Sequence, residues 1–240
     1  MKRESKTNKL VVVLIFSSLI LYLINYIIFK DFHHIAMFFT EDLAFIPIEV
    51  LVTVLIIEKE LERIDNQNKL QKINLLIEIF FEEVGTELLA KIASNDIRCI
   101  NISDYIASLG GSIINNYKEI EDNIENYNYN LSLNESDIDE IYELLYENKV
   151  SFLRFIENPY IGEHDIFTDL LQSAIHLSSE IKYRRGKGSI NKDDIAHLNR
   201  DVSRLYKYLA KEWVVYMKYI EKEYPFLYSF AIDHMPFGKY

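Results

Sequence analysis

The sequence predicts an all-α protein, in which an N-terminal two-helix transmembrane hairpin precedes an antiparallel bundle of about five helices. Two apolar runs lie near the N-terminus, at residues 11–29 and 43–57. Only 7 Gly and 4 Pro occur in 240 residues, which favours long helices over strands and turns. Beyond the second run, apolar residues recur at the three- and four-residue spacing of amphipathic helices.

The first apolar run predicts a membrane span by its length. It holds 19 residues, 11–29, without a charged side chain, and a helix needs about 20 residues to cross the hydrocarbon of a bilayer. A cleavable signal peptide fits less well, because its apolar part is about 7 to 15 residues long and small residues follow it. Here Lys30 and Asp31 follow, so we expect an uncleaved anchor.

The second run is shorter, at 15 residues, and contains Glu49. At 1.5 Å per residue it covers about 22 Å, less than the roughly 30 Å of hydrocarbon. We still expect residues 43–57 to span, because a segment that only dips into the bilayer leaves backbone groups without partners in lipid. Asn25 and Glu49 then lie at similar depths, which predicts a hydrogen bond between these two intramembrane polar side chains.

Lysine and arginine positions predict the orientation of the hairpin. Eight flank it, namely Lys2, Arg3, Lys6, Lys9, Lys59, Arg63, Lys69 and Lys72, whereas the loop 30–42 contains only Lys30. Because positive residues favour the cytoplasmic side, we expect a two-span protein of the cell membrane with both termini in the cytoplasm. The expected organisation is a basic tail at 1–10, the hairpin at 11–57 and a cytoplasmic helical domain at 58–240.

The pattern of this domain predicts five helices in succession. The first is expected over residues 70–88 and the second over 106–127, each from its apolar stripe. The third begins at a cap within 134–136 and ends near 158–159, because the residue before a proline is restricted to extended conformations. The fourth is expected over about 165–183.

The fifth helix has the clearest signal. Asn191 suits the N-cap, and Asp193 and Asp194 lie in the first turn, where the helix dipole favours negative charge. The apolar residues within 195–220 fall within about 40° of one direction at 100° per residue. The aromatic tail, 224–230, is expected to pack across the bundle or at a membrane interface. Short connections between the helices predict an antiparallel bundle.

Composition argues against several classes of function. The net charge of −11 disfavours a nucleic-acid partner, because phosphate binding rests on clustered Lys and Arg. The single cysteine, Cys99, cannot form an intramolecular disulfide, which fits a reducing compartment. The chain has no HExxH, CxxC, GxSxG or glycine-rich phosphate loop. We therefore expect no cofactor and favour an interaction protein over an enzyme.

One group of side chains has the composition of a metal site, namely Glu163, His164, His176 and Glu180. His176 and Glu180 are four residues apart and share a helix face, as two ligands must. At 100° per residue, however, His176 points about 160° away from the apolar stripe of its helix. A solvated polar face is the ordinary interpretation, and a metal site is the alternative.

A carboxylate di-iron bundle would need Glu-x-x-His on two helices. The nearest match in this chain is Asp194-x-x-His197. His197 points about 130° away from the apolar centre of the fifth helix at 100° per residue. A di-iron centre is therefore the weaker of the two metal hypotheses.

Three stretches of the chain form a recognisable set, namely Phe80–Leu89 (FFEEVGTELL), Glu157-Asn158-Pro159 with Glu163–Leu171 (EHDIFTDLL), and Glu212-Trp213 with the aromatic tail. Together they resemble an uncharacterised group of prokaryotic proteins that combine a two-span hairpin with a helical cytosolic domain. The resemblance covers most of the chain and implies the same topology. No activity is assigned to that group, so the resemblance implies no mechanism.

These observations predict a membrane-anchored cytoplasmic helical module for protein–protein interaction or self-association. Its expected partners are the lipid bilayer and either another protein or a second copy of the chain. One alternative is a metal-binding protein or enzyme that uses the region of Glu163, His164, His176 and Glu180. The other alternative is an accessory subunit of a transporter.

Overall fold

The computed structural model describes residues 2–96, 105–106, 112–129, 131–186 and 192–237. Every regular element within these ranges is a helix, as the sequence predicts. The chain divides into two compact units, the N-terminal unit at residues 1–65 and the C-terminal unit at 66–240. Cys99 and the predicted N-cap Asn191 lie outside the described residues.

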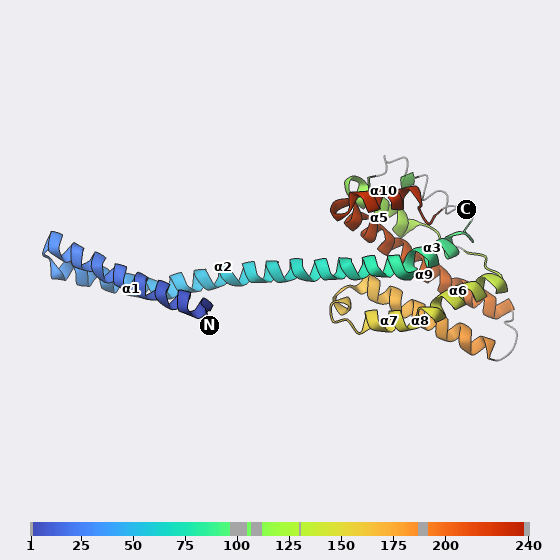
Figure 1. Cartoon of the computed structure of the whole chain (residues 1–240), viewed down its shortest axis with the longest axis horizontal. Coiled ribbons are helices and arrows are strands. Elements are labelled where there is room, and N and C mark those ends of the chain that lie inside the picture. Colours follow the sequence, from blue (N-terminus) through green and yellow to red (C-terminus); the bar gives the residue numbers. More distant parts are fainter. Residues whose placement is uncertain (1, 97–104, 107–111, 130, 187–191, 238–240) are drawn as a thin grey trace. The chain divides into compact units, whose positions relative to one another are not determined.

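The N-terminal unit contains a helical hairpin. Helix α1 (Lys2–Phe29) and the first part of α2 (Phe32–Phe80) run antiparallel, as Figure 1 shows. A turn of two residues joins them, and in it Lys30 adopts a left-handed φ of 51°. Most of the loop predicted at 30–42 is therefore helical, because that segment has no Gly or Pro to interrupt α2.

Among the residues that the structure describes, no helix combines the length and the apolar character that crossing a membrane requires. This finding contradicts the predicted transmembrane hairpin, with spans at 11–29 and 43–57, and the predicted two-span location in the cell membrane. The second run is not a separate segment, because it continues α2 directly after Glu41 and Asp42.

The C-terminal unit is a bundle built around its longest helix. After α2 follow η1 (Phe81–Gly85), α3 (Thr86–Ala93), α5 (Ile113–Asn126), α6 (Glu135–Glu147), α7 (Lys149–Ile156), η2 (Ile161–Glu163), α8 (Asp165–Arg185), α9 (Lys192–Glu223) and α10 (Pro225–Asp233). Helix α9 contacts α3, α5, α8 and α10, and α8 also contacts α6 and α7 (Figure 1). Two helices from separate parts of the sequence, α5 and α8, thereby meet the same central helix.

The apolar stripe predicted for the fifth helix forms the core face of α9. Its buried members are Leu198, Val202, Leu205, Leu209, Trp213, Tyr216 and Ile220. The aromatic tail also packs on this unit, as the sequence suggests. Within the tail, the Tyr228 hydroxyl accepts a hydrogen bond from the Ile113 N–H at 3.3 Å. Beyond the tail, Phe237 lies edge to face against the indole of Trp213, with ring centroids 5.0 Å apart.

Local side-chain contacts set the boundaries of α6 and α7. Helix α6 begins at a capping box, in which the Asn134 side chain accepts from the Asp137 N–H at 3.1 Å. The Asp137 carboxylate accepts in return from the Asn134 N–H at 2.9 Å. Asn148, with φ −93° and ψ 6°, ends α6 and begins α7. The third predicted helix is therefore two helices.

Helix α2 passes into α3 through the π-helical turn η1. The Thr86 hydroxyl donates to the Phe81 carbonyl at 2.8 Å, five residues back along the chain. A Cβ on Gly85 would lie 2.5 Å from Cε1 of Phe80 and 2.8 Å from Cδ1 of Phe81. Since both rings are buried, a glycine is needed here to let two aromatic rings pack against the backbone.

Replacing Gly85 by alanine is expected to lower the free energy of unfolding by about 1 to 3 kcal/mol, the usual cost of overpacking. The added methyl group meets two rings that other side chains hold in place, so neither ring can move away freely. Urea unfolding followed by the fluorescence of Trp213, which lies in the same unit, measures the loss.

Gly162 supplies the control, because no atom lies within 4 Å of a Cβ built there. Gly162→Ala should change the free energy of unfolding by no more than about 0.5 kcal/mol. Equal effects of the two alanine substitutions would contradict the role assigned to the ring contacts.

Candidate functional sites

The structure separates the four side chains of the predicted metal group. Glu163 forms an ion pair with Lys69 at 3.2 Å. His164 caps the start of α8, where its Nδ1 accepts from the Phe167 N–H at 3.2 Å. His176 is exposed on α8, about 18 Å further along the helix axis at 1.5 Å per residue. These residues therefore do not converge on one ion.

Glu180, the fourth residue, meets side chains that the sequence pattern did not group with it. On α9, His197 and Asp201 lie four residues apart and face Glu180 across the contact between α8 and α9. The ligand atoms of these three residues all lie within 4.8 Å of one another. The four-residue spacing of His197 and Asp201 could have indicated from the sequence that these two side chains lie together. That Glu180 joins them follows only from the packing of α8 on α9.

A second site lies in the core, at Glu212 on α9. Its side chain is fully buried, and neither carboxyl oxygen has a hydrogen-bond partner within the described structure. Oε1 lies 3.6 Å from Nδ1 of His164. Sequence reasoning did not single out Glu212 as a candidate site, although it follows Leu209 by three residues and precedes Tyr216 by four, which places it on the buried face.

Glu212 and His164 form a neutral pair, even though their distance is that of an ion pair. Burial raises the pKa of Glu212 to about 8, against a smaller opposing effect of Lys211. Burial also lowers the pKa of His164, against smaller opposing effects of a backbone hydrogen bond and of Asp165. Both shifts have the same main cause, the loss of hydration of the charged form, so a carboxylic acid faces an uncharged imidazole near neutral pH.

A cavity of about 370 Å³ lies beside this pair. It is lined by Tyr117, Glu121, Asp122, Ile124, Glu125, His164, Ile166, Lys211, Val214 and Val215. Helices α5 and α9 and the start of α8 thus contribute to it. The Lys207 ammonium group donates to Glu125 at 2.7 Å, and the Tyr117 hydroxyl donates to Glu121 at 3.3 Å. Perturbed pKa values next to a cavity are typical of functional sites.

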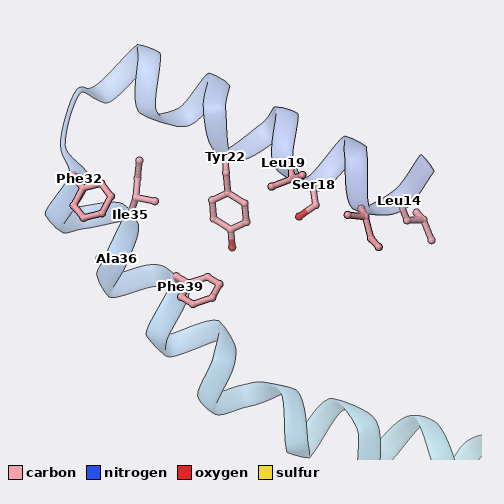
Figure 2. A pocket seen from close by; sticks show the side chains of 9 residues that line it. Leu14, Ser18, Leu19, Tyr22, Phe32, Ile35, Ala36 and Phe39 are labelled. Carbon is pink, nitrogen blue, oxygen red and sulfur yellow. The ribbon is translucent and has the colours of Figure 1, made fainter. Parts of the chain in front are cut away.

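A third feature is a groove of about 720 Å³ between the two helices of the hairpin. Its lining is Leu14, Ile15, Ser18, Leu19, Tyr22, Phe32, Ile35, Ala36 and Phe39. Figure 2 shows side chains of both helices directed toward the space between them. Tyr22 and Phe39 face each other across it, with ring centroids 6.4 Å apart. The lining is almost entirely apolar.

The predicted partners Asn25 and Glu49 do not lie at the same level of this hairpin. Asn25 lies three residues beyond Tyr22 toward the turn, whereas Glu49 lies ten residues beyond Phe39 in the opposite direction. At 1.5 Å per residue, the two are about 20 Å apart along the hairpin. Both are exposed. The prediction assumed that the second helix starts at residue 43, but α2 starts at residue 32.

The chain is thus an all-helical protein, with an apolar hairpin in one unit and a helical bundle in the other. Comparison with known proteins divides it in the same way. Residues 2–61 match a family described as "MJ1433, N-terminal helical domain", and residues 69–233 match one described as "Uncharacterized protein MJ1433, C-terminal helical domain". The chain therefore belongs to the MJ1433 family.

The uncharacterized protein MJ1433 of Methanocaldococcus jannaschii is similar along nearly its whole length. It is 37% identical over 224 residues, which are 93% of this chain and 90% of the relative. No solved structure matches the chain. The family descriptions name helical domains and no activity, which agrees with the resemblance to an uncharacterised group but gives no support to its membrane hairpin.

Proposed function

We propose that this protein is a helical interaction module that self-associates through its N-terminal hairpin. The observation that carries the proposal is the exposure of apolar side chains along the hairpin. Val12, Leu19 and Leu55 keep 63%, 63% and 56% of their surface exposed. Soluble monomers rarely expose contiguous apolar patches larger than a few hundred Å², so a partner that covers the hairpin lowers its free energy.

Three features of the hairpin favour a second copy of the chain as that partner. Two antiparallel helices form half of a four-helix bundle, and two hairpins together can bury the apolar face of each helix. The groove between α1 and α2 leaves room for side chains from outside the hairpin. The apolar stretch 12–28 has no charge, so it offers no electrostatic selection for a different protein.

Charge at the end of the hairpin opposite the turn also favours a second copy of the chain as the partner. The sequence places four basic residues within 2–9 of α1. On α2, residues 58–65 hold four acidic side chains and the basic side chains of Lys59 and Arg63, a net charge of −2, and Glu58 and Glu62 line a cleft there together with Leu61. Because the helices are antiparallel, these oppositely charged segments lie toward the same end of the hairpin. A two-fold dimer pairs the same surface on both copies and can set the basic segment of one copy against the acidic segment of the other.

The proposal is tested by the molar mass of the full chain in solution. Sedimentation velocity over a range of concentrations should show a dimer or a larger closed oligomer. Leu19→Lys places a charge in the groove and should weaken association by more than about tenfold, since removing water from an unpaired charge is costly. The expected result is a shift of the variant toward the monomer.

Leu70→Lys is the matched control, because Leu70 is 58% exposed but lies outside the hairpin. This variant should associate like the unmodified chain. Equal behaviour of the two lysine variants would contradict the proposal, as would a monomeric chain at all concentrations. Capture of the hairpin by lipid vesicles, with one copy per particle, would also overturn it.

Less supports the metal-binding alternative at Glu163, His164, His176 and Glu180, because Glu163 pairs with Lys69, His164 caps α8 and Glu180 meets His197 instead. The transporter-subunit alternative receives no support from the contacts of the described residues. Self-association remains the function with the most direct physical support, the exposed apolar surface of the hairpin.

A further inference from the structure

A candidate metal site lies where α8 meets α9, in the C-terminal unit and apart from the hairpin. The His197 Nδ1 atom lies 3.3 Å from Oε1 of Glu180 and 2.9 Å from Oδ2 of Asp201. The three ligand atoms come from two helices, and helix packing fixes their separation. His197 and Asp201 are held on one face of α9 by their spacing of four residues.

These distances match the coordination shell of a small divalent cation. Zinc binds nitrogen and oxygen ligands at about 2.0 to 2.2 Å with tetrahedral geometry, so neighbouring ligand atoms lie about 3.3 Å apart. The two measured separations, 3.3 and 2.9 Å, are close to that value. Imidazole nitrogen and carboxylate oxygen are both ordinary zinc ligands.

An independent observation is the state of the Asp201 carboxylate. Its Oδ2 atom is buried and, among the described residues, has no hydrogen-bonding neighbour other than the ring nitrogen of His197, whereas Arg204 contacts the other oxygen, Oδ1, at 3.3 Å. The Nδ1 atom of His197 lies 2.9 Å from this Oδ2 atom, so one cation can contact the nitrogen and the oxygen together.

Arginine side chains surround the ligands as outer partners. The Arg184 Nε–H donates to Oε1 of Glu180 at 3.0 Å, and Arg184 also pairs with Asp194. Such contacts orient a ligating carboxylate, while their positive charge reduces the attraction for a cation. His197 is 48% exposed, so solvent can reach a fourth coordination position and the ion has a path of entry.

We propose that Glu180, His197 and Asp201 bind a divalent transition-metal ion of the zinc type, with water as the fourth ligand. The geometry assigns one nitrogen and two oxygen ligands to the protein. Calcium and magnesium prefer six or more oxygen ligands, so a nitrogen-containing set of three favours zinc or cobalt over them. The competing explanation for the short distances is an ion pair without metal, between a protonated His197 and the two carboxylates.

Calorimetric titration of the full chain with Zn²⁺ alone, after removal of metal with a chelator, tests the proposal. One ion should bind per chain, and Co²⁺ in its place should give the intense visible absorption of a tetrahedral site. His197→Ala and Asp201→Asn should each weaken Zn²⁺ binding by more than about tenfold, since each removes a ligand. Neither side chain belongs to the apolar core, so both variants should fold.

His176→Ala is the control, because His176 is an exposed histidine of α8 outside the cluster. It should leave the affinity for Zn²⁺ and the Co²⁺ spectrum unchanged. Zinc binding that His176→Ala weakens as much as His197→Ala would overturn the proposal. A chain that binds no stoichiometric Zn²⁺ would also overturn the proposal. The same holds for an octahedral Co²⁺ spectrum that Asp201→Asn does not change. Either result would mean that an ion pair without metal accounts for the short distances among the three side chains.

Discussion

Replacing Phe80 by alanine is expected to lower the free energy of unfolding of the C-terminal unit by about 3 to 5 kcal/mol. Phe80 is 1% exposed and packs on Phe81, Phe152, Phe155 and Phe167, with ring centroids 5.2, 6.2, 6.0 and 5.3 Å away. The truncation leaves a cavity where α2 meets α7 and α8. Since domains are stable by only about 5 to 15 kcal/mol, the loss is large.

Urea unfolding monitored by Trp213 fluorescence measures this effect. Phe226→Ala is the control, because Phe226 is 95% exposed on α10 and its removal creates no cavity. Its free energy of unfolding should change by no more than about 0.5 kcal/mol. A loss below about 1 kcal/mol for Phe80→Ala would show that the aromatic cluster relaxes to fill the space.

Replacing Glu212 by glutamine is expected to remove a pH dependence of stability between pH 6.5 and 8. Burial raises the pKa of Glu212 from an ordinary value of 4.5 to about 8. In this range the unfolded chain has released the proton and the folded protein retains it. The folded state therefore loses stability as pH rises, until the folded-state pKa is passed.

The expected loss of stability is calculated over the pH range in which Glu212 is the main group to titrate differently in the folded and unfolded states. The lowered pKa of His164 acts in the opposite direction below about pH 6.5, because the unfolded imidazole takes up a proton there. Over the remaining 1.5 pH units, at about 1.4 kcal/mol per unit, the loss is about 2 kcal/mol. Glutamine keeps the shape of the acid without titrating, so the variant should be more stable than the unmodified chain at pH 8.

Urea unfolding at pH 6.5 and pH 8 measures both proteins under matched conditions. Glu147→Gln makes the same chemical change at an exposed position of α6 and should keep the full pH dependence. If Glu212→Gln keeps it as well, Glu212 is already ionised in the folded protein at pH 6.5, and the neutral pair with His164 does not form.

Periodicity in the sequence was sufficient to predict much of the C-terminal unit. The helical spacing within 195–220 gave the buried face of α9, because one helix that packs on several neighbours must keep its apolar residues on one side. The cap at Asn134 was also predicted, and the packing of the aromatic tail on the bundle was one of the two positions predicted for it. The break at Asn148 was missed, since the apolar pattern continues through it from α6 into α7.

Local pattern was a poor guide in the hairpin. Residues 30–42 look like a loop between two apolar runs, but they contain no helix breaker, and α2 begins at Phe32. This early start displaces Glu49 from Asn25. The membrane spans were inferred from the length of apolar runs, and the described helices do not meet the requirement for a span.

The sequence by itself determined the helical class of the fold and the buried face of α9, because propensity, capping and apolar spacing are properties of neighbouring residues. Only the tertiary structure decided which polar side chains meet. Glu180 joins His197 and Asp201, and His164 faces Glu212, across helix contacts that bring together residues 17 to 48 positions apart. The pattern of one helix shows where its faces point but not which neighbour covers them. The candidate sites of this protein therefore depend on the packing of α5 and α8 around α9.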